Sequence, residues 1–329
     1  MTIANALRSI IVRLPNPLGD AVMALPLISN LKHGLPNCQI YLAGNPAYES
    51  IFSHLGEHVN FVELDNALNV FQQAKKLEAI NAEAIILCPN SWSSAIVALL
   101  SKTKIRVGRK QHGRSLLLTK SMATIDRPRL MTDIYNELAQ AFGIDIDEYP
   151  VSIDITSQPL DWLEQDVAYF MVAPGSAFGK SKQYPLPKLA ATIDEIQTQF
   201  GLVPVLFGSP DEHDILEQLG DKLSSAYQAA PEGTSLSEIL VALKSSKFLL
   251  CMDSGARHLA AAVSTPQAVI FGPTNPAWTA HSTDIAEFIS HTDLECLGCH
   301  LKNCPKQNHP CMTEIPPSQI VNEVSRLLS

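Results

Sequence analysis

The sequence of 329 residues lacks several features that mark common classes of protein. Basic side chains are in the minority, with 24 Lys and Arg against 33 Asp and Glu, and the formal net charge is −9. Because neutralising a phosphate backbone needs a surplus of basic side chains, this balance argues against a general nucleic-acid-binding protein. Charged residues make up only 17% of the chain and apolar residues 46%, which is typical of a globular protein with a sizeable core.

Long apolar runs are missing as well. No segment approaches the roughly 20 consecutive apolar residues that a membrane-spanning helix needs, and the run at 94–101 is typical of a buried helix. The first residues do not fit a secretory signal peptide, because their apolar run is short, Arg13 follows closely and no cleavage site of small residues is present. We therefore expect a cytoplasmic protein whose seven cysteines are mostly reduced thiols.

Two familiar phosphate-binding motifs are also absent. The chain contains neither G-x-G-x-x-G nor G-x-x-x-x-G-K-[ST], so neither a dinucleotide fingerprint nor a P-loop supports nucleotide binding here. No internal repeat and no low-complexity tract is visible.

What the sequence contains is an alternation of short β-rich runs with helical patterns in both halves. Near-continuous apolar strands separated by helices predict an α/β fold with parallel sheets covered on both faces. The pattern restarts after a polar stretch near 145–160, so we expect two doubly wound domains, residues 1–157 and 158–329, with the last helix a candidate to pack back on the first domain. The expected strands lie within residues 9–14, 39–44, 84–89, 169–176, 202–209, 247–255 and 267–274.

Four loops of the second half follow predicted strands, which is where ligands bind in doubly wound folds. In the first loop, Gly175 and Gly179 allow close approach of backbone to a ligand and Lys182 supplies a cation, although a turn with a solvated lysine explains the same residues. In the second, Glu212 is the candidate to accept hydrogen bonds from ribose hydroxyls, and helix capping explains it equally well. The four loops are 173–185, 207–214, 252–262 and 271–276.

The loop at 252–262, MDSGARHLAAA, is the most informative of the four. A strand is expected to end at Asp253 and a helix to begin near Gly255, so free N–H groups and the positive end of the helix dipole would form an anion site suited to a pyrophosphate. Ser254 adds a hydroxyl, and His258 lies one turn into the helix on the same side. In the alternative interpretation, Asp253 or Ser254 caps the helix and His258 packs.

The last of the four loops and one turn of the first half also carry candidate side chains. The turn FGPTNP is stiffened by two prolines and offers the hydroxyl of Thr274. In the first half, NPLGDAVMALP places Gly19 and Asp20 where a strand turns into a helix. Capping is the default role for such an aspartate. The functional interpretation is a carboxylate that projects into the interdomain cleft, as a general base must to deprotonate an attacking hydroxyl.

Taken together and in this order, RLPNPLGDAVMALP, PGSAFGKSKQYP, FGSPDEHD, DSGARHLAAA and FGPTNP resemble the heptosyltransferases of glycosyltransferase family 9 over nearly the whole chain. The start LGDAVMALP and the Cys-rich tail at 294–312 resemble the heptosyltransferase II branch most closely. The resemblance implies a GT-B fold of two Rossmann-like domains facing across a cleft. It also implies inverting transfer of heptose from ADP-heptose to the heptosylated inner core of lipopolysaccharide, with ADP as product, no required cofactor and no metal.

The resemblance also assigns residues to roles. Asp20 matches the catalytic base, and Lys182 matches the phosphate-facing lysine and joins it as catalytic. Tyr184 departs from the family, which more often has a Trp before the proline, and Arg257 stands where an apolar residue is common. The implied donor-binding residues are Ser176, Lys182, Glu212, Asp253, Ser254, Gly255, His258 and Thr274, and the implied acceptor-binding residues are Asn16, Gly19, Arg109 and Arg114.

A triplet, Asp145-Ile146-Asp147, matches the DxD pattern of metal-dependent GT-A transferases. Because it lies in the presumed interdomain stretch, we favour a solvated loop. Lys182 and the helix N-terminus near 254–258 are instead expected to stabilise the charge that develops on the departing pyrophosphate, the role that metals fill elsewhere.

Residues 101–125 hold seven basic side chains and no acidic one. Such a run is usually a solvated face. Here we favour a patch that guides the phosphates of a lipid A-Kdo-heptose type glycolipid and the anionic inner leaflet. Arg109 and Arg114, which flank Gly113, are the expected direct contacts. The expected location is therefore peripheral, at the cytoplasmic face of the inner membrane, with no nucleic-acid partner.

Four cysteines crowd into the tail with the spacing C-x2-C-x4-C-x6-C, and His300 and His309 lie nearby. Structural zinc, disulfides and free thiols all stay open, because this spacing is unlike the common zinc ribbon, and no metal is assigned. The four are Cys296, Cys299, Cys304 and Cys311.

Two alternatives to heptosyltransferase II activity stay open. One is another family 9 transferase, of type I or III or using a different sugar nucleotide. The other is a GT-B-fold nucleotide-sugar epimerase or binding module, for which His258 is a candidate acid/base group. The presence of both Asp20 and Lys182 favours an active transferase. The acceptor hydroxyl, the oligomeric state and the degree of domain closure cannot be read from the sequence.

Overall fold

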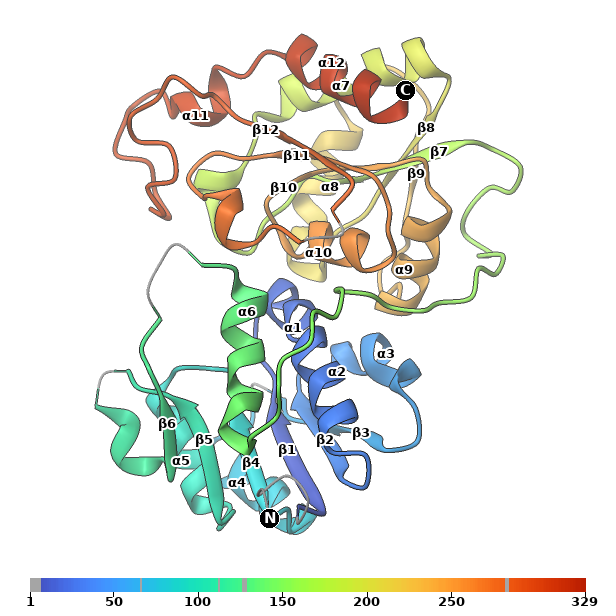
Figure 1. Cartoon of the computed structure of the whole chain (residues 1–329). Coiled ribbons are helices and arrows are strands. Elements are labelled where there is room, and N and C mark those ends of the chain that lie inside the picture. Colours follow the sequence, from blue (N-terminus) through green and yellow to red (C-terminus); the bar gives the residue numbers. More distant parts are fainter. Residues whose placement is uncertain (1–6, 66, 112, 126–128, 282–283) are drawn as a thin grey trace. The chain divides into compact units, whose positions relative to one another are not determined.

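The computed structural model describes residues 7–65, 67–111, 113–125, 129–281 and 284–329 (Figure 1). The chain divides into two compact units, Met1–Val151 and Ser152–Ser329. The division falls a few residues before the expected boundary after residue 157. Each unit contains one six-stranded sheet, so the prediction of an α/β chain with two doubly wound, Rossmann-like units is confirmed.

The first unit alternates strands with helices and short 3₁₀ turns. Its elements are β1 (Ser9–Arg13), α1 (Leu18–Met23), α2 (Leu25–Gly34), β2 (Gln39–Gly44), η2 (Pro46–Tyr48), α3 (Glu49–Phe52), η3 (Ser53–Leu55), β3 (Val59–Glu63), α4 (Val70–Ile80), β4 (Ala84–Leu87), α5 (Trp92–Leu100), β5 (Ile105–Arg109), η4 (Arg114–Leu117), β6 (Lys120–Met122), α6 (Met131–Asn136) and η5 (Glu137–Phe142).

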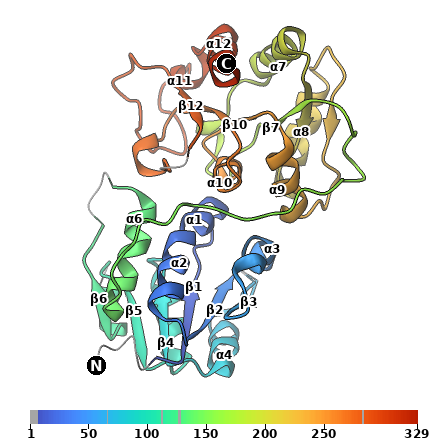
Figure 2. The same ribbon diagram turned by 45° about the vertical axis from the view of Figure 1, so that its right-hand side comes forward.

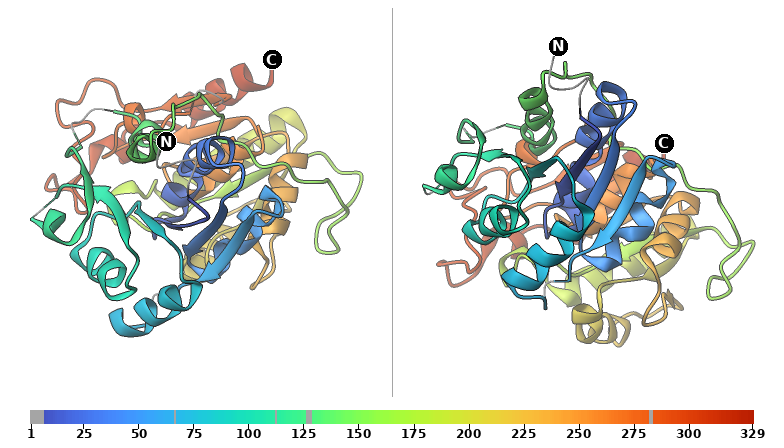
Figure 3. Two further views of the ribbon diagram at one scale, coloured as in Figure 1. Left: turned by 60° about the horizontal axis from the view of Figure 1, so that its bottom comes forward. Right: turned by 90° about the horizontal axis from the view of Figure 1, so that it is seen from below.

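All strands of this unit run parallel in the order β3-β2-β1-β4-β5-β6. Every residue of β4 is buried, as expected for a strand covered on both faces. Helices α1, α2 and α6 pack together on one face of the sheet, and α4 packs against α5 on the other (Figures 1 and 3). The strand order reverses between β1 and β4, which places the loop after β1 at the switch point of the sheet.

The second unit repeats the architecture. Its elements are β7 (Tyr169–Ala173), η6 (Lys180–Lys182), α7 (Leu186–Phe200), β8 (Val203–Leu206), η7 (Pro210–Glu212), α8 (His213–Gly220), β9 (Gln228–Ala229), α9 (Leu236–Ser245), β10 (Leu249–Met252), α10 (Gly255–Ala262), β11 (Gln267–Ile270), η8 (Pro276–Trp278), β12 (Ala286–Ile289), α11 (Pro310–Thr313) and α12 (Pro317–Leu328).

The second sheet is also parallel, with the order β12-β11-β10-β7-β8-β9. The rings of Phe170 and Phe248 stack in its core with centroids 4.9 Å apart. Helix α7 packs against α8 and α12, and α9 packs against α10 (Figure 2). The order reverses between β7 and β10, so the loops after these two neighbouring strands meet at the switch point.

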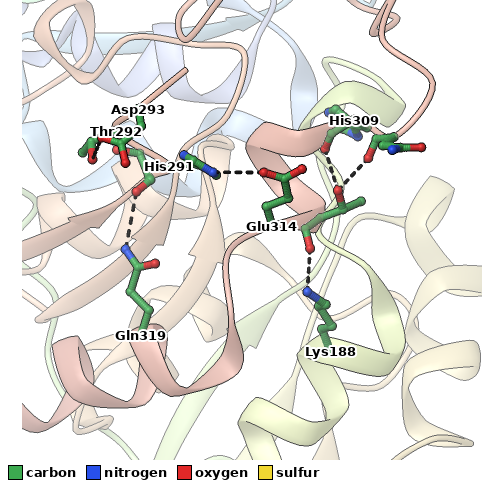
Figure 4. Close-up of polar contacts among 10 residues, drawn as sticks. Lys188, His291, Thr292, Asp293, His309, Glu314 and Gln319 are labelled. Carbon is green, nitrogen blue, oxygen red and sulfur yellow. Dashed lines mark hydrogen bonds and ion pairs between the residues drawn. The ribbon is translucent and has the colours of Figure 1, made fainter. Parts of the chain in front are cut away.

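The C-terminal segment is fastened to its own unit. Helix α12 packs on α7, β11 and β12. Lys188 donates from Nζ to the carbonyl of Thr313 at 2.5 Å, and the ring of His291 lies 3.1 Å from the carboxylate of Glu314 (Figure 4). These contacts hold the segment that carries the four clustered cysteines against the second sheet. Among the helices of the described residues, none combines the length and the apolar character that a membrane span requires.

Candidate active site

The switch point of the second unit carries a buried ion pair. The ammonium of Lys182, at the end of η6, lies 2.6 Å from Oδ2 of Asp253 and donates to its backbone carbonyl at 2.7 Å. The hydroxyl of Thr274 donates to the same carboxylate oxygen at 2.6 Å. Their side chains come from the loops after β7, β10 and β11, so the parallel sheet brings together three residues that the sequence analysis assigned to one donor site.

The conformation of the loop after β7 explains how Lys182 reaches this position. Gly179 has φ of +134°, a backbone conformation that favours glycine, and the N–H of Lys182 donates to its carbonyl at 3.1 Å. The ring of Phe178 lies 4.8 Å from the ammonium, within the range of a cation–π contact. Tyr184 is fully buried and donates to the carbonyl of Ile315, and burial raises its pKa to about 12. Ser176 lies in the same loop and is partly exposed.

Glu212 lies against the same loop. Its Oε2 accepts from the N–H and the hydroxyl of Ser209, at 2.8 and 3.0 Å, in a capping box. A Cβ at Gly175 would lie 2.1 Å from Oε1 of Glu212, so a larger residue here would have to displace the Glu212 side chain. The structure thus confirms a capping role for Glu212 and also places its carboxylate over the backbone of the loop that carries Lys182.

Helix α10 begins with Ser254 as its N-cap, and the Ser254 side chain makes no capping hydrogen bond. The Ser254 side chain therefore does not occupy the first N–H groups of the helix, and Gly255 is partly exposed, so the anion site expected here stays a prediction. Asp253 does not act as a simple cap either, because its carboxylate is engaged by Lys182 and Thr274.

His258 differs from the prediction of a ligand-facing side chain. It is 4% exposed, and its Nδ1 lies 2.7 Å from Nε2 of His281, with the two rings in an edge-to-face arrangement. Burial and the Arg257 guanidinium together lower the pKa of His258 well below its ordinary value and that of His281 to about 3. Both histidines are therefore neutral near pH 7. His281 is a hydrogen-bonding partner for His258 of α10, and neither ring offers a cation to a phosphate.

Three residues of this neighbourhood were not predicted as site residues, namely Arg257, His281 and Asp284. Arg257 is fully buried, donates to the carbonyl of Thr279 at 2.7 Å and pairs with Asp284 at 3.0 Å. Its guanidinium also lies over the rings of Phe271 and Phe288. Arg257 and His281 thus tie α10 to the segment that follows η8. A charge on the buried side of an otherwise apolar helix was the available signal for Arg257.

In the first unit, Asp20 lies in the first turn of α1 and is partly exposed. The hydroxyl of Tyr135, on α6, donates to its Oδ1 at 3.2 Å. The N-cap of α1 is Pro17 and no side-chain capping bond is present, so the default capping role is not the one observed. A carboxylate in a first turn is favourably placed toward the helix dipole.

Hydrogen bonds from Arg13 and Tyr48 fix the loop before α1. Arg13 donates to Oδ1 of Asn16 at 2.9 Å and to the carbonyl of Leu14 at 2.7 Å, and Tyr48 donates to the Asn16 carbonyl at 2.5 Å. Burial lowers the pKa of Arg13, and burial together with the Asp20 charge raises that of Tyr48. Of these two predicted acceptor residues, Asn16 is exposed and Gly19 is buried.

The other two predicted acceptor contacts differ from the prediction. Arg109 is 3% exposed, pairs with Glu137 at 2.6 Å and donates to the carbonyl of Ile134. Arg114 is fully buried and donates to the carbonyls of Pro89 and Ser91 at 2.7 and 3.0 Å. Burial lowers the pKa of Arg114 to about 10, so it stays cationic near pH 7. Both guanidinium groups bond to partners inside the first unit, so neither is exposed to a phosphate.

The four clustered cysteines line one pocket with Ser181, Pro273 and His309 among its other walls. All four are free thiols, and burial raises the pKa of Cys311 to about 11. No group of three or more His, Cys, Asp or Glu side chains within the described ranges is arranged to hold a metal ion. Asp145 and Asp147 are exposed in a loop without helix or strand, as the sequence analysis favoured for this triplet.

Comparisons with known proteins agree with the resemblance. The sequence model of glycosyltransferase family 9 (heptosyltransferase) matches residues 70–309. Lipooligosaccharide heptosyltransferase 2 of Haemophilus influenzae is 26% identical over 342 residues, covering 96% of this chain and 98% of the relative. Lipopolysaccharide heptosyltransferase 2 of Escherichia coli K12 is 24% identical over 348 residues, covering 95% and 97%.

Among solved structures, that of E. coli ADP-heptose lps heptosyltransferase II is similar with a TM-score of 0.80 and 23% identity, covering 97% of this chain and 98% of the other. At this identity the likeness shows a shared fold, and the fold includes both units. With a family model that matches most of its length, the chain belongs to glycosyltransferase family 9, the heptosyltransferases.

Proposed function

We propose that this protein transfers heptose from ADP-heptose to the heptosylated inner core of lipopolysaccharide, with inversion at the anomeric carbon, as a heptosyltransferase of the type II branch. The observation that carries the proposal is the constellation of Lys182, Asp253 and Thr274 at the switch point of the second sheet. The likeness to heptosyltransferase 2 relatives over nearly the full chain supports the choice of donor and acceptor.

On the donor side, the second unit binds the ADP moiety. An ammonium has three donors, and two of those on Lys182 are directed at Asp253. The third is available to a phosphate oxygen, while the N–H groups at the start of α10 bind the same pyrophosphate. As the bond between the anomeric carbon and the phosphate oxygen breaks, its electron pair leaves with ADP, and these donors stabilise the growing charge. We propose that no metal is required.

On the acceptor side, Asp20 acts as the general base. It takes the proton from the acceptor hydroxyl as that oxygen forms its bond to the anomeric carbon, on the face opposite the departing ADP. The hydrogen bond from Tyr135 fixes the orientation of the carboxylate. The acceptor is a glycolipid of the lipid A-Kdo-heptose type, so we place the protein at the cytoplasmic face of the inner membrane.

The test is incubation with ADP-heptose and core acceptors that bear zero, one or two heptoses, in the presence and absence of a chelator. We expect ADP release and a product heavier by one heptose with the singly heptosylated acceptor alone, unaffected by the chelator. Transfer to the heptose-free acceptor would instead identify type I activity. ADP release without any acceptor would indicate hydrolysis, and loss of activity with the chelator would overturn metal independence.

A further inference from the structure

Among the described residues of the first unit, most of the exposed large apolar side chains lie on α5 and η4, and Phe71 on the neighbouring helix α4 is the exception. Leu116 of η4 is 88% exposed, and Trp92 and Leu99 of α5 are 44% and 42% exposed. Isolated apolar residues on a surface need no explanation. On α5, however, the partly or fully exposed apolar residues are spaced i, i+4, i+7 and i+8, so they form one stripe along the outer side of the helix. The stripe consists of Trp92, Ile96, Leu99 and Leu100.

Helix α5 and η4 form one surface because a buried side chain joins them. Arg114 opens η4, and its guanidinium donates to the carbonyls of Pro89 and Ser91 just before α5. The position of a Cβ on Gly113 lies 3.6 Å from Cζ2 of Trp92. The two elements are in contact. Leu116 and the α5 stripe therefore belong to one exposed area, here named the α5–η4 face.

The charge around this face has one sign in the sequence. Residues 84–125 contain seven basic side chains and no acidic one. Two of the seven, Arg109 and Arg114, are buried, but Lys102, Lys104 and Lys110 are exposed next to α5 and η4. Lys102 also pairs with Glu78 of α4 at 2.5 Å on the surface, which leaves Lys104 and Lys110 as the stronger positive charges.

We propose that the α5–η4 face docks the first unit on an anionic lipid bilayer. Lys104 and Lys110 would contact lipid phosphates, while Trp92 and Leu116 enter the interface between headgroups and acyl chains. Charge complementarity decides for a lipid surface, because an apolar stripe bordered by lysines, with Glu78 of α4 already paired to Lys102, matches anionic headgroups over apolar chains. The inference rests on the proposed function for its biological setting, since the lipid-linked acceptor lies in such a membrane.

The test is co-sedimentation of the full chain with vesicles of phosphatidylcholine alone or mixed with phosphatidylglycerol, at low and high salt. We expect binding to the anionic vesicles that weakens as salt rises. The variant Leu116→Ser and the double variant Lys104→Glu plus Lys110→Glu should each lower the partition coefficient about tenfold or more. Matched controls in the second unit, Ile285→Ser and Lys222→Glu plus Lys247→Glu, change exposed residues of the same kinds and should bind as the wild type does.

Equal binding by the α5–η4 variants and the controls would overturn the proposal, as would binding to neutral vesicles alone. A Leu116→Ser variant that changes a dimer into a monomer without affecting vesicle binding would identify the face as a contact between copies of this chain, and would overturn it too. Vesicle binding needs no sugar nucleotide, so its failure is distinct from failure of the proposed transfer, which is measured with a detergent-solubilised acceptor.

Discussion

The two units share a strand order but differ in the chemistry of their switch points. In the second unit the switch point carries a buried ion pair reinforced by a hydroxyl, Lys182–Asp253–Thr274. In the first unit it carries a partly exposed carboxylate, Asp20, contacted by Tyr135 at the longer distance of 3.2 Å. The same scaffold thus carries a buried, hydrogen-bonded ion pair in one case and a partly exposed carboxylate in the other, which suits the proposed roles of donor site and general base.

The largest effect that tests this comparison is on turnover. Replacing Asp20 by Asn removes the proposed base while keeping its shape, so kcat should fall by about 10²–10⁴-fold and the Kd for ADP should stay unchanged. Steady-state ADP release and calorimetric ADP binding measure the two quantities. The control Asp145→Asn, in the DxD triplet, should have wild-type activity. A variant Asp20→Asn with normal turnover would remove Asp20 from this role.

The next effect is on the stability of the second unit. Lys182→Met leaves the Asp253 carboxylate buried without its cation, which should lower the free energy of unfolding by about 3–5 kcal/mol and abolish ADP binding. Lys180→Met, at an exposed position of the same 3₁₀ turn, should change neither. Adding Asp253→Leu to Lys182→Met should restore much of the stability without ADP binding. Full ADP binding by the single variant would contradict the proposed site.

A smaller effect is expected on the pH dependence of the stability of the second unit. Because burial lowers the pKa of His258 and His281, the folded state keeps both neutral while the unfolded chain takes up protons below about pH 6.5. Stability is therefore present above that pH and is lost as the pH falls toward about 3 for His281. We expect about 2 kcal/mol of loss per histidine between pH 7 and 5, measured by urea unfolding. The variant His281→Leu should flatten this dependence, whereas His58→Gln, exposed in the first unit, should not.

The smallest effect concerns the contact that orients the base. Tyr135→Phe deletes one hydrogen bond to the Asp20 carboxylate, which should cost about 1 kcal/mol in the transition state, or roughly fivefold in kcat. ADP binding should be unaffected. Tyr41→Phe in β2 is the control. If Tyr135→Phe reduced turnover as strongly as Asp20→Asn, Tyr135 would be part of the chemistry itself rather than a positioning residue.

The sequence predicted the elements that are long or strongly apolar. All seven expected strands are present, but β3, β5, β6, β9 and β12 were not predicted. β9 has two residues and β6 three, and β5 interrupts its apolar pattern with two arginines. Short or edge strands owe their conformation to neighbours far away in the chain, so their own residues carry a weak pattern.

The candidate site was predictable where residues follow strands directly. Lys182, Asp253 and Thr274 were assigned from their positions after strands, and the parallel sheet brings them together. Arg109 and Arg114 were misplaced because a count of charges does not tell which way a side chain points. In β5 the alternation of Ile105, Val107 and Arg109 already indicated a common face. The partners His281 and Asp284 lie in an irregular segment, where no local pattern pointed to them.

The close approach of Glu212 to Gly175 limits how these loops can vary in sequence. A methyl group at position 175 would fit only if the carboxylate left the hydrogen bonds that it accepts from Ser209. The residues allowed at positions 175 and 212 therefore depend on each other. A residue larger than glycine at 175 costs the capping bonds of Glu212 unless position 212 carries a shorter side chain, so related chains that change one of these positions should tend to change the other.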